Sequence, residues 1–367
     1  MKKRILSMVC AGLLGASLVG CSQPAATATT AAPETTAAAA ETKAETAAAS
    51  GDSAKTADTT DIKAPEGFPK DPITFVVGFA AGGGVDTATR LMTKYLQEYV
   101  DVPIVVTNTT GASGVVAVTD VLKKPADGYT VVTLASGAAL GDCTGTATYS
   151  YLDDIEFIAL QDSVPYALSF RTGDDRFSTG EEFLQYVKDH PGEITVALSG
   201  INNANHMAAL SMVQDCGYEM ELVPFDGSAN AKTAFLGGHV DAFCETILET
   251  KSMMDEGQSV CVCTFGDMDF SSELPGVPTS EDLGMNLKIT GTNRGYGYKK
   301  GTDPEIVNYM SALMKKVTED PRFIEECEKM GLGNCINYKD SADYKAFATE
   351  EYNNYMELCK SLGIAKQ

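Results

Sequence analysis

Short apolar runs of strand length alternate with amphipathic segments along residues 73–134. The predicted strands are, in chain order, Ile73–Phe79, Pro103–Thr107 and Thr130–Leu134. From Asp86 to Tyr99 apolar side chains recur at helical spacing, and a second helix is predicted to end near Leu122. This strand–helix–strand–helix–strand order predicts a parallel sheet.

The same alternation restarts near residue 194. The predicted elements are strands at Ile194–Leu198, Glu221–Phe225 and Val240–Phe243, a helix carrying Met207, Leu210 and Val213, and a helix over Ser228–Leu236. Two similar units predict two α/β lobes. In open α/β sheets, ligands bind beyond the carboxyl ends of the strands, so a cleft between the lobes is expected there. The loops at those ends are predicted to be Phe79–Asp86, Ala135–Gly137, Ser199–Asn203 and Phe225–Ser228.

The N-terminus has the pattern of an export signal. Met1–Arg4 is positively charged, and Ile5–Val19 is an apolar run too short to span a membrane. The sequence Leu-Val-Gly-Cys ending at Cys21 resembles the lipobox of bacterial lipoproteins; an ordinary signal peptide with a chance cysteine is the alternative. We predict a signal peptide over 1–20, lipidation at Cys21, and a disordered Ala/Thr-rich tether over 21–67. The protein would then be extracytoplasmic and anchored to the cell membrane.

Composition narrows the function. Lys plus Arg number 28 against 50 Asp plus Glu, a net charge of -22, which argues against nucleic-acid binding. The chain has three His and no Trp, and no motif places a Ser or Cys nucleophile beside His206, which is expected to be a structural helix residue. We therefore predict no catalytic residue, metal or cofactor, and a protein that is not an enzyme. Ten Cys are present, and no spacing fixes a disulfide pairing.

Two loops could bind anions. The Gly-rich stretch ending at Gly84 places bare backbone before a helix, where free N–H groups and the helix dipole favour a carboxylate or phosphate. A tight turn without a ligand is the alternative, and the stretch lacks the pattern of a nucleotide P-loop. Ser199–Asn203 opens a second-lobe helix in the same way, so the two loops could hold the two ends of a small diacid. Asp86 could contact a ligand or cap its helix, and Arg294 could pair with a ligand carboxylate or lie exposed at the surface.

Several motifs, taken in order, resemble one known family. They are Pro72–Asp86 with Arg90, Asn108 with Gly111–Gly114, Ala126–Thr130, Pro191-Gly192 with Ser199-Gly200 and His206, Val223–Ser228, Leu236–Asp241, Pro275–Thr279 and Gly301–Pro304. Together they resemble the receptors of tripartite tricarboxylate transporters, also called the Bug family. The resemblance runs from about residue 70 to the C-terminus. It departs at Thr109-Thr110, where the family usually has Arg-Pro, and at Asn293-Arg294, where it often has an aromatic pair.

The resemblance implies a two-lobe fold of the periplasmic-binding-protein type, type II-like, that closes around a small carboxylate and delivers it to the membrane components of the transporter. The implied ligand-binding residues are Phe79, Ala80, Ala81, Gly82, Gly83, Asp86, Ser136, Ser199, Gly200, Asn203, Phe225, Asp226 and Gly227, with Arg294 as a further candidate. Lobe 1 is expected over 68–166 plus 289–367 and lobe 2 over 167–288, in a monomer. The alternatives are an exported enzyme or a sensory binding protein that uses the Gly-rich loop for a phosphorylated or other polar metabolite.

Overall fold

The computed structural model describes residues 62–225 and 227–366. The predicted signal peptide, Cys21, most of the predicted tether, and Asp226 lie outside the described residues. Within the described part, none of the helices combines the length and the apolar character needed to cross a bilayer.

The first lobe is built on three parallel strands. β1 (Ile73–Val77) lies between β2 (Ile104–Asn108) and β3 (Thr130–Ala135), which confirms the predicted parallel arrangement. The helical elements are α1 (Gly84–Leu96), the 3-10 turn η1 (Ala112–Gly114), α2 (Val115–Val121) and α3 (Ser136–Cys143). β1 is fully buried at alternate positions and half-buried at the others, whereas its continuous apolar run predicts burial on both faces. α1 buries one apolar face, as its spacing predicts.

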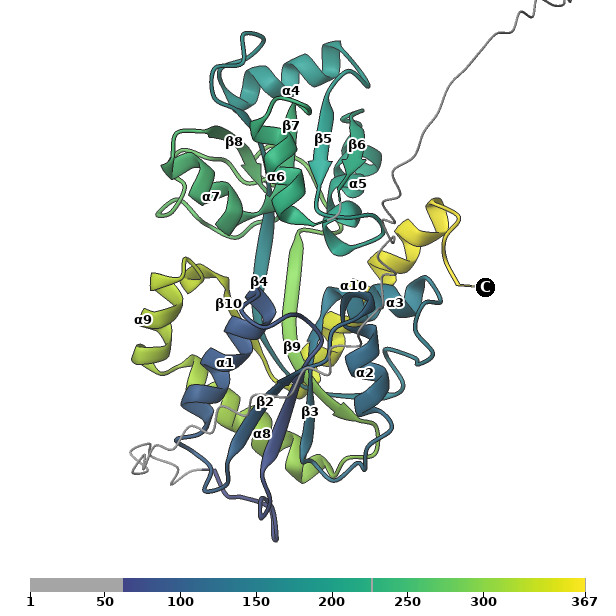
Figure 1. Ribbon diagram of the computed structural model, residues 1–367, viewed down its shortest axis with the longest axis vertical. Coiled ribbons are helices and arrows are strands. Elements are labelled where there is room, and N and C mark those ends of the chain that lie inside the picture. Colours follow the sequence, from purple (N-terminus) through teal and green to yellow (C-terminus); the bar gives the residue numbers. More distant parts are fainter. Residues whose placement is uncertain (1–61, 226, 367) are drawn as a thin grey trace, which may run out of the picture. The chain divides into compact units, whose positions relative to one another are not determined.

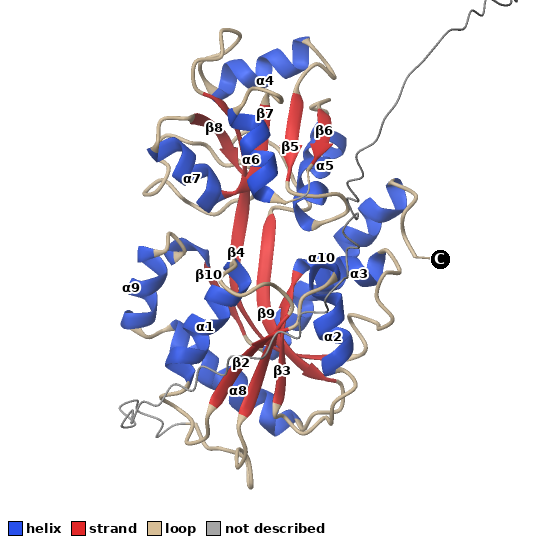
Figure 2. Ribbon diagram, in the orientation of Figure 1, coloured by secondary structure: helices blue, strands red, loops and turns tan. Residues whose placement is uncertain are grey.

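The second lobe repeats this plan. β5 (Thr195–Leu198) pairs in parallel with β6 (Glu221–Pro224) and with β7 (Ala242–Thr246). Its helices are α4 (Gly180–Asp189), α5 (Ala204–Cys216), α6 (Ser228–Leu236) and α7 (Ile247–Asp255), and β8 (Ser259–Thr264) completes it. α6 has the predicted bounds, and Figure 2 shows helices flanking the strands of both lobes.

Two long strands connect the lobes (Figure 1). β4 (Ile155–Arg171) pairs antiparallel with β9 (Gly291–Lys299) as far as Pro165, and from Tyr166 it pairs with β7 and β8 instead. β9 also pairs antiparallel with β3, so the sheet is mixed rather than purely parallel. The sequence pattern had not predicted these strands. The partners of β4 change between Pro165 and Tyr166, and the lobe boundaries given above stay predictions.

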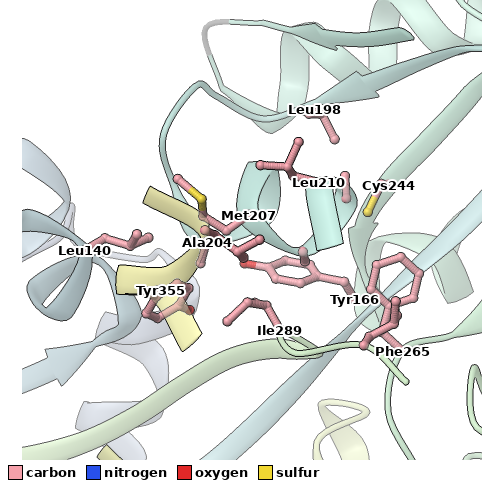
Figure 3. Packing of buried hydrophobic residues seen from close by; sticks show 14 of the residues in the cluster. Leu140, Tyr166, Leu198, Ala204, Met207, Leu210, Cys244, Phe265, Ile289 and Tyr355 are labelled. Carbon is pink, nitrogen blue, oxygen red and sulfur yellow. The ribbon is translucent and has the colours of Figure 1, made fainter. Parts of the chain in front are cut away.

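The C-terminal segment returns to the first lobe. It comprises α8 (Pro304–Thr318), α9 (Pro321–Lys329), the 3-10 turn η2 (Gly333–Cys335), β10 (Ile336–Lys339) and α10 (Ser341–Ser361). β10 pairs antiparallel with β4, and α10 contacts α3, β4 and α5. Tyr166, Ile289 and Tyr355 belong to one buried cluster together with Met207 of α5 (Figure 3). The junction of the two lobes is therefore packed with apolar and aromatic side chains.

Candidate ligand-binding site

The Gly-rich loop exposes its backbone at the start of α1. Ala80, Ala81, Gly82, Gly83 and Gly84 are exposed, while Phe79 is half-buried. Gly82 has a φ of +79°, a conformation that favours glycine, and Gly83 precedes the helix without any side-chain cap. The first N–H groups of a helix have no partner within the helix. An anion placed here would meet both these donors and the positive end of the helix dipole.

Asp86 holds this loop in place rather than facing solvent. Its side chain is buried, and its carboxylate accepts hydrogen bonds from the Gly82 N–H at 2.8 Å, Asn108 Nδ2 at 2.8 Å and Arg90 Nε at 2.9 Å. Burial alone would raise the pKa of Asp86, but the bonds from Arg90, Gly82 and Asn108 hold it below its ordinary value. Of the two roles open to Asp86, these contacts favour the structural one, in which it accepts from one backbone N–H, that of Gly82, and from two side chains.

Ser136 begins a helix, so the predicted loop over Ala135–Gly137 is wrong. β3 runs directly into α3 because these residues are small. A Cβ on Gly137 would lie 2.3 Å from the Ser113 carbonyl oxygen. The Ser136 hydroxyl donates to Glu351 Oε1 at 2.9 Å and accepts from the Asn293 N–H at 3.1 Å. These bonds occupy the hydroxyl within the protein, which leaves the backbone N–H groups at the start of α3 as donors for a ligand.

The Ser199–Asn203 loop is fixed by amide side chains. The Ser199 N–H donates to Asn205 Oδ1 at 3.0 Å, and Asn205 Nδ2 donates to the Cys244 carbonyl at 2.7 Å. Asn203 caps α5 by accepting from the His206 N–H at 2.9 Å. A Cβ on Gly200 would lie 2.6 Å from Asn203 Nδ2, so a side chain there would displace the amide that caps α5.

His206 has a structural role, as expected. Its Nδ1 accepts a hydrogen bond from the Asn202 N–H at 3.1 Å, and burial lowers its pKa. A ring that already accepts from the backbone stabilises the turn, and within the described part of the chain no Ser or Cys side chain forms a hydrogen bond with it.

The second candidate loop of the second lobe, Phe225–Ser228, lies next to the Ser199 loop. The Phe225 N–H donates to the Leu198 carbonyl at 2.9 Å, and Gly227, with a φ of +89°, precedes α6. Phe225 is half-buried and Gly227 is exposed. Both loops therefore leave the carboxyl edge of β5 and β6.

Sequence reasoning missed Glu245, at the end of β7. Its side chain is buried near Ser199 and Ser228, and its Oε1 accepts from the Thr246 N–H at 3.0 Å. Burial raises the pKa of Glu245, against the opposing effect of the Ser199 hydroxyl. Glu245 could have been identified from the sequence, because the rule that ligands bind beyond the carboxyl ends of strands applies to β7 as well.

Arg294 is buried, so the expectation of an exposed surface arginine is wrong. Its Nε lies 2.5 Å from Asp162 Oδ1, and its Nη1 donates to the Gly84 carbonyl at 2.9 Å. Its Nη2 is buried without a hydrogen-bond partner among the described residues. Arg294 of β9 therefore links the first turn of α1 to β4, and a sequence pattern could not reveal a partner 132 positions away.

Neighbouring residues of β9 thus support two loops of the first lobe. Asn293 contacts Ser136, and Arg294 contacts Gly84. In the second lobe, Ser199 and Glu245 lie together. Among the described residues no group of three or more His, Cys, Asp or Glu is placed to hold a metal ion. The cysteines of this part of the chain are all free thiols: Cys143, Cys216, Cys244, Cys261, Cys263, Cys327, Cys335 and Cys359.

Two α/β lobes joined by two long strands, with small-residue loops at the strand ends, define a two-lobe solute-binding protein. Residues 88–364 match the family model described as "Tripartite tricarboxylate transporter family receptor". The chain belongs to this family.

Similar proteins agree with this assignment. A protein encoded in the gbd 5' region of Cupriavidus necator is 27% identical over 299 residues, which cover 82% of this chain and 90% of that protein. The crystal structure of a TctC solute-binding protein from Polaromonas without ligand has a TM-score of 0.69 and 26% identity, covering 80% of this chain and 99% of the other. The periplasmic binding protein BugD has a TM-score of 0.64 and 26% identity, covering 82% of this chain and 100% of its own.

Proposed function

We propose that this protein captures a small organic carboxylate between its two lobes and delivers it to the membrane components of a tripartite tricarboxylate transporter. The observation that carries the proposal is the exposed backbone of residues 80–84 at the start of α1. The Ser199–Asn203 loop at the start of α5 offers a second such position in the other lobe. The fold itself is known to hold diacids, since structures of proteins 23% and 24% identical to this chain contain adipate and malate.

The proposed contacts are mostly to backbone. In lobe 1 they are Phe79, Ala80, Ala81, Gly82, Gly83 and the N–H groups that begin α3 at Ser136; in lobe 2 they are Ser199, Gly200, Asn203, Phe225, Asp226 and Gly227. The Gly82 and Gly83 N–H groups already donate to Asp86 and to the Ala80 carbonyl, so these two glycines would give a ligand space rather than a donor. Asp86 and Arg294 support the first loop through hydrogen bonds with the backbone of Gly82 and Gly84. Hydrogen bonds to a charged group contribute about 1.5–3 kcal/mol each, so a few of them, less the ordering costs, suffice for micromolar affinity at about -8 kcal/mol.

The remaining features follow from export. We propose that residues 1–20 are removed, that Cys21 carries the lipid, and that residues 21–67 tether a monomeric receptor to the outer face of the cell membrane. Binding and release need no chemical step, so the protein is proposed to act without catalysis, cofactor or metal-dependent chemistry. An enzyme would need a nucleophile or a general base in the cleft. His206, the histidine nearest the Ser199 loop in sequence, is already bonded to Asn202.

Thermal unfolding against a ligand panel tests this function. The panel contains mono-, di- and tricarboxylates and amino acids, with sugar phosphates and NAD as controls. A ligand present at 100 times its dissociation constant adds about 2.7 kcal/mol to the free energy of unfolding, enough to raise the midpoint by several degrees. We expect a shift with one class of carboxylate. Shifts confined to sugar phosphates or nucleotides would contradict the proposal and favour an exported enzyme.

A further inference from the structure

Buried carboxylates in this protein are not all neutralised in the same way. Asp162 has Arg294 as its counter-ion at 2.5 Å, and Asp142 has Lys366 at 2.5 Å. Glu351 of α10 is 7% exposed, yet no lysine, arginine or histidine among the described residues forms an ion pair with it. A buried charge without a partner is strongly unfavourable. Glu351 therefore needs either a proton or a cation.

A pocket lies beside Glu351 at the junction of the lobes. It has a volume of about 150 Å³, and oxygen-bearing side chains from α10 and from the segment entering β9 line it. Tyr355 also lines it, and its wholly buried hydroxyl lies against the Glu351 carboxylate. Figure 3 shows Tyr355 in the same cluster as Ile289, another residue of the pocket wall. A buried carboxylate and a buried hydroxyl thus border one polar space.

The one lysine that lines the pocket is already engaged. Lys288 Nζ lies 2.6 Å from Glu357 Oε1 and 3.8 Å from Asp215 Oδ1, and no ion pair joins it to Glu351 among the described residues. Glu350, the other acid of the wall, adds negative charge. The pocket therefore has more carboxylates than available positive groups.

We propose that this pocket binds a small monovalent cation, either an alkali ion or a primary ammonium group, whose charge neutralises Glu351. The oxygen donors around it are Glu350, Glu351, Thr290 and Tyr355, together with the side-chain oxygen of Asn354. Oxygen ligands are those that hard cations prefer. The volume accommodates such an ion with a few water molecules.

The site would act on the proposed carboxylate cleft through Glu351. Glu351 Oε1 accepts from the Ser136 hydroxyl at 2.9 Å and from Asn293 Nδ2 at 2.8 Å. An ionised Glu351 strengthens both bonds, because hydrogen bonds to a charged acceptor are the stronger ones. A bound cation would therefore stabilise the junction between α3, β9 and α10. The cation site does not depend on which solute the cleft holds.

A proton is the competing partner of Glu351. Burial raises the pKa of Glu351, while hydrogen bonding to Asn293, Ser136 and Tyr355 opposes that shift. The other titratable groups around it are phenols, Tyr151, Tyr166, Tyr344 and Tyr355, with Glu350 and Lys288 at the pocket wall. The phenols stay neutral because burial raises the pKa of each of them. Cation affinity should therefore fall as pH is lowered and Glu351 takes up a proton.

Thermal unfolding of the full chain in the salt of a bulky cation, N-methylglucamine chloride at pH 8, provides the test. Sodium, potassium or methylammonium chloride replaces that salt at constant ionic strength. We expect a saturable rise of the unfolding midpoint, about 3 °C at ten times the dissociation constant. A rise with sodium or potassium would identify an alkali-ion site, and a rise with methylammonium would identify an ammonium site. Glu351→Gln should abolish the rise, whereas Asp343→Asn, which removes an exposed carboxylate of the same helix, should retain it.

Two results would overturn the cation site. One is a midpoint that is the same in every salt, checked by calorimetric titration of the unmodified protein, which needs no variant to fold. The other is an infrared carboxylic-acid band at pH 8 that Glu351→Gln removes, because it would show a proton where the cation is proposed.

Discussion

At the scale of single residues, the Gly-rich loop depends on Asp86. Three donors converge on its carboxylate, and one of them is the backbone N–H of Gly82 inside the loop. The loop can therefore present its backbone to solvent without a ligand to hold its shape. Asp86 belongs to the support of the site, and its side chain is buried away from any solute.

Asp86→Asn should destabilise the protein by about 1–3 kcal/mol at pH 7, because it replaces charge-assisted bonds with neutral ones. The pKa of Asp86 is lower when folded than when unfolded. Its stabilisation is therefore present above the unfolded value of about 4 and is lost as the pH falls through the folded value. Denaturant unfolding of both proteins between pH 7 and pH 3 measures this. The difference between them should shrink toward the acid end, and a constant difference would contradict the role given to Asp86.

At the scale of elements, β4 and β9 bring the loops together. β9 contacts Ser136 through Asn293 and Gly84 through Arg294, so one connecting strand reaches two helix starts. Gly291 begins this strand beside β4 where β4 changes partners, and a Cβ there would lie 2.3 Å from the Val164 carbonyl oxygen and 2.8 Å from Pro165 Cα. Such contacts are to backbone and cannot be relieved by a side-chain rotation.

Gly291→Ala should therefore lower the free energy of unfolding by about 1–3 kcal/mol, the usual cost of overpacking. Gly84→Ala is the matched control, because its Cβ would meet only the Arg294 guanidinium at an ordinary 3.5 Å. Chemical denaturation of the two variants provides the comparison. Equal stability of Gly291→Ala and the wild type would mean that β4 and β9 separate more easily than their packing indicates.

The elements with a local signal could be predicted from the sequence. Apolar periodicity and glycine breaks are enough to predict the strand starting at Ile73, the helix over Ser228–Leu236 and the parallel order of β1, β2 and β3. β4 and β9 could not be found in this way. β4 is buried on both faces along most of its length, and β9 carries a buried arginine and three glycines, so neither shows a clear alternation.

The residues of the candidate site also fall into those with a local sequence signal and those without one. The Gly-rich loop and the Ser199 loop could be proposed because glycine and serine between a strand and a helix are a local pattern. Asn293 and Glu351 could not, because each acts through a partner far away in the chain, as Glu351 does with Ser136, 215 positions away. Whether these loops hold a solute stays a prediction.

At the scale of the whole molecule, the central claim is that an overall acidic protein binds an acid. The chain has a net charge of -22, which repels a carboxylate at long range. Affinity must then come from donors at short range, and the exposed backbone at the start of α1 supplies them without a basic side chain. The neighbouring cation, Arg294, is already paired with Asp162. Binding should therefore depend on the ligand's charge and on space at the loop.

Calorimetric titration of the best carboxylate from the panel tests this claim most directly, using the wild type and Gly83→Val, with the diamide of the same acid as control ligand. Gly83 has an ordinary φ of -74°, which valine can adopt, and its Cβ would lie 3.2 Å from the Ala80 carbonyl oxygen, so the valine side chain should narrow the loop with only a small local adjustment. We expect micromolar binding to the wild type, with at least a roughly 100-fold loss, about 2.7 kcal/mol, for either the variant or the diamide. Equal binding of acid and diamide, or unchanged affinity in a folded Gly83→Val, would show that the loop is not an anion site.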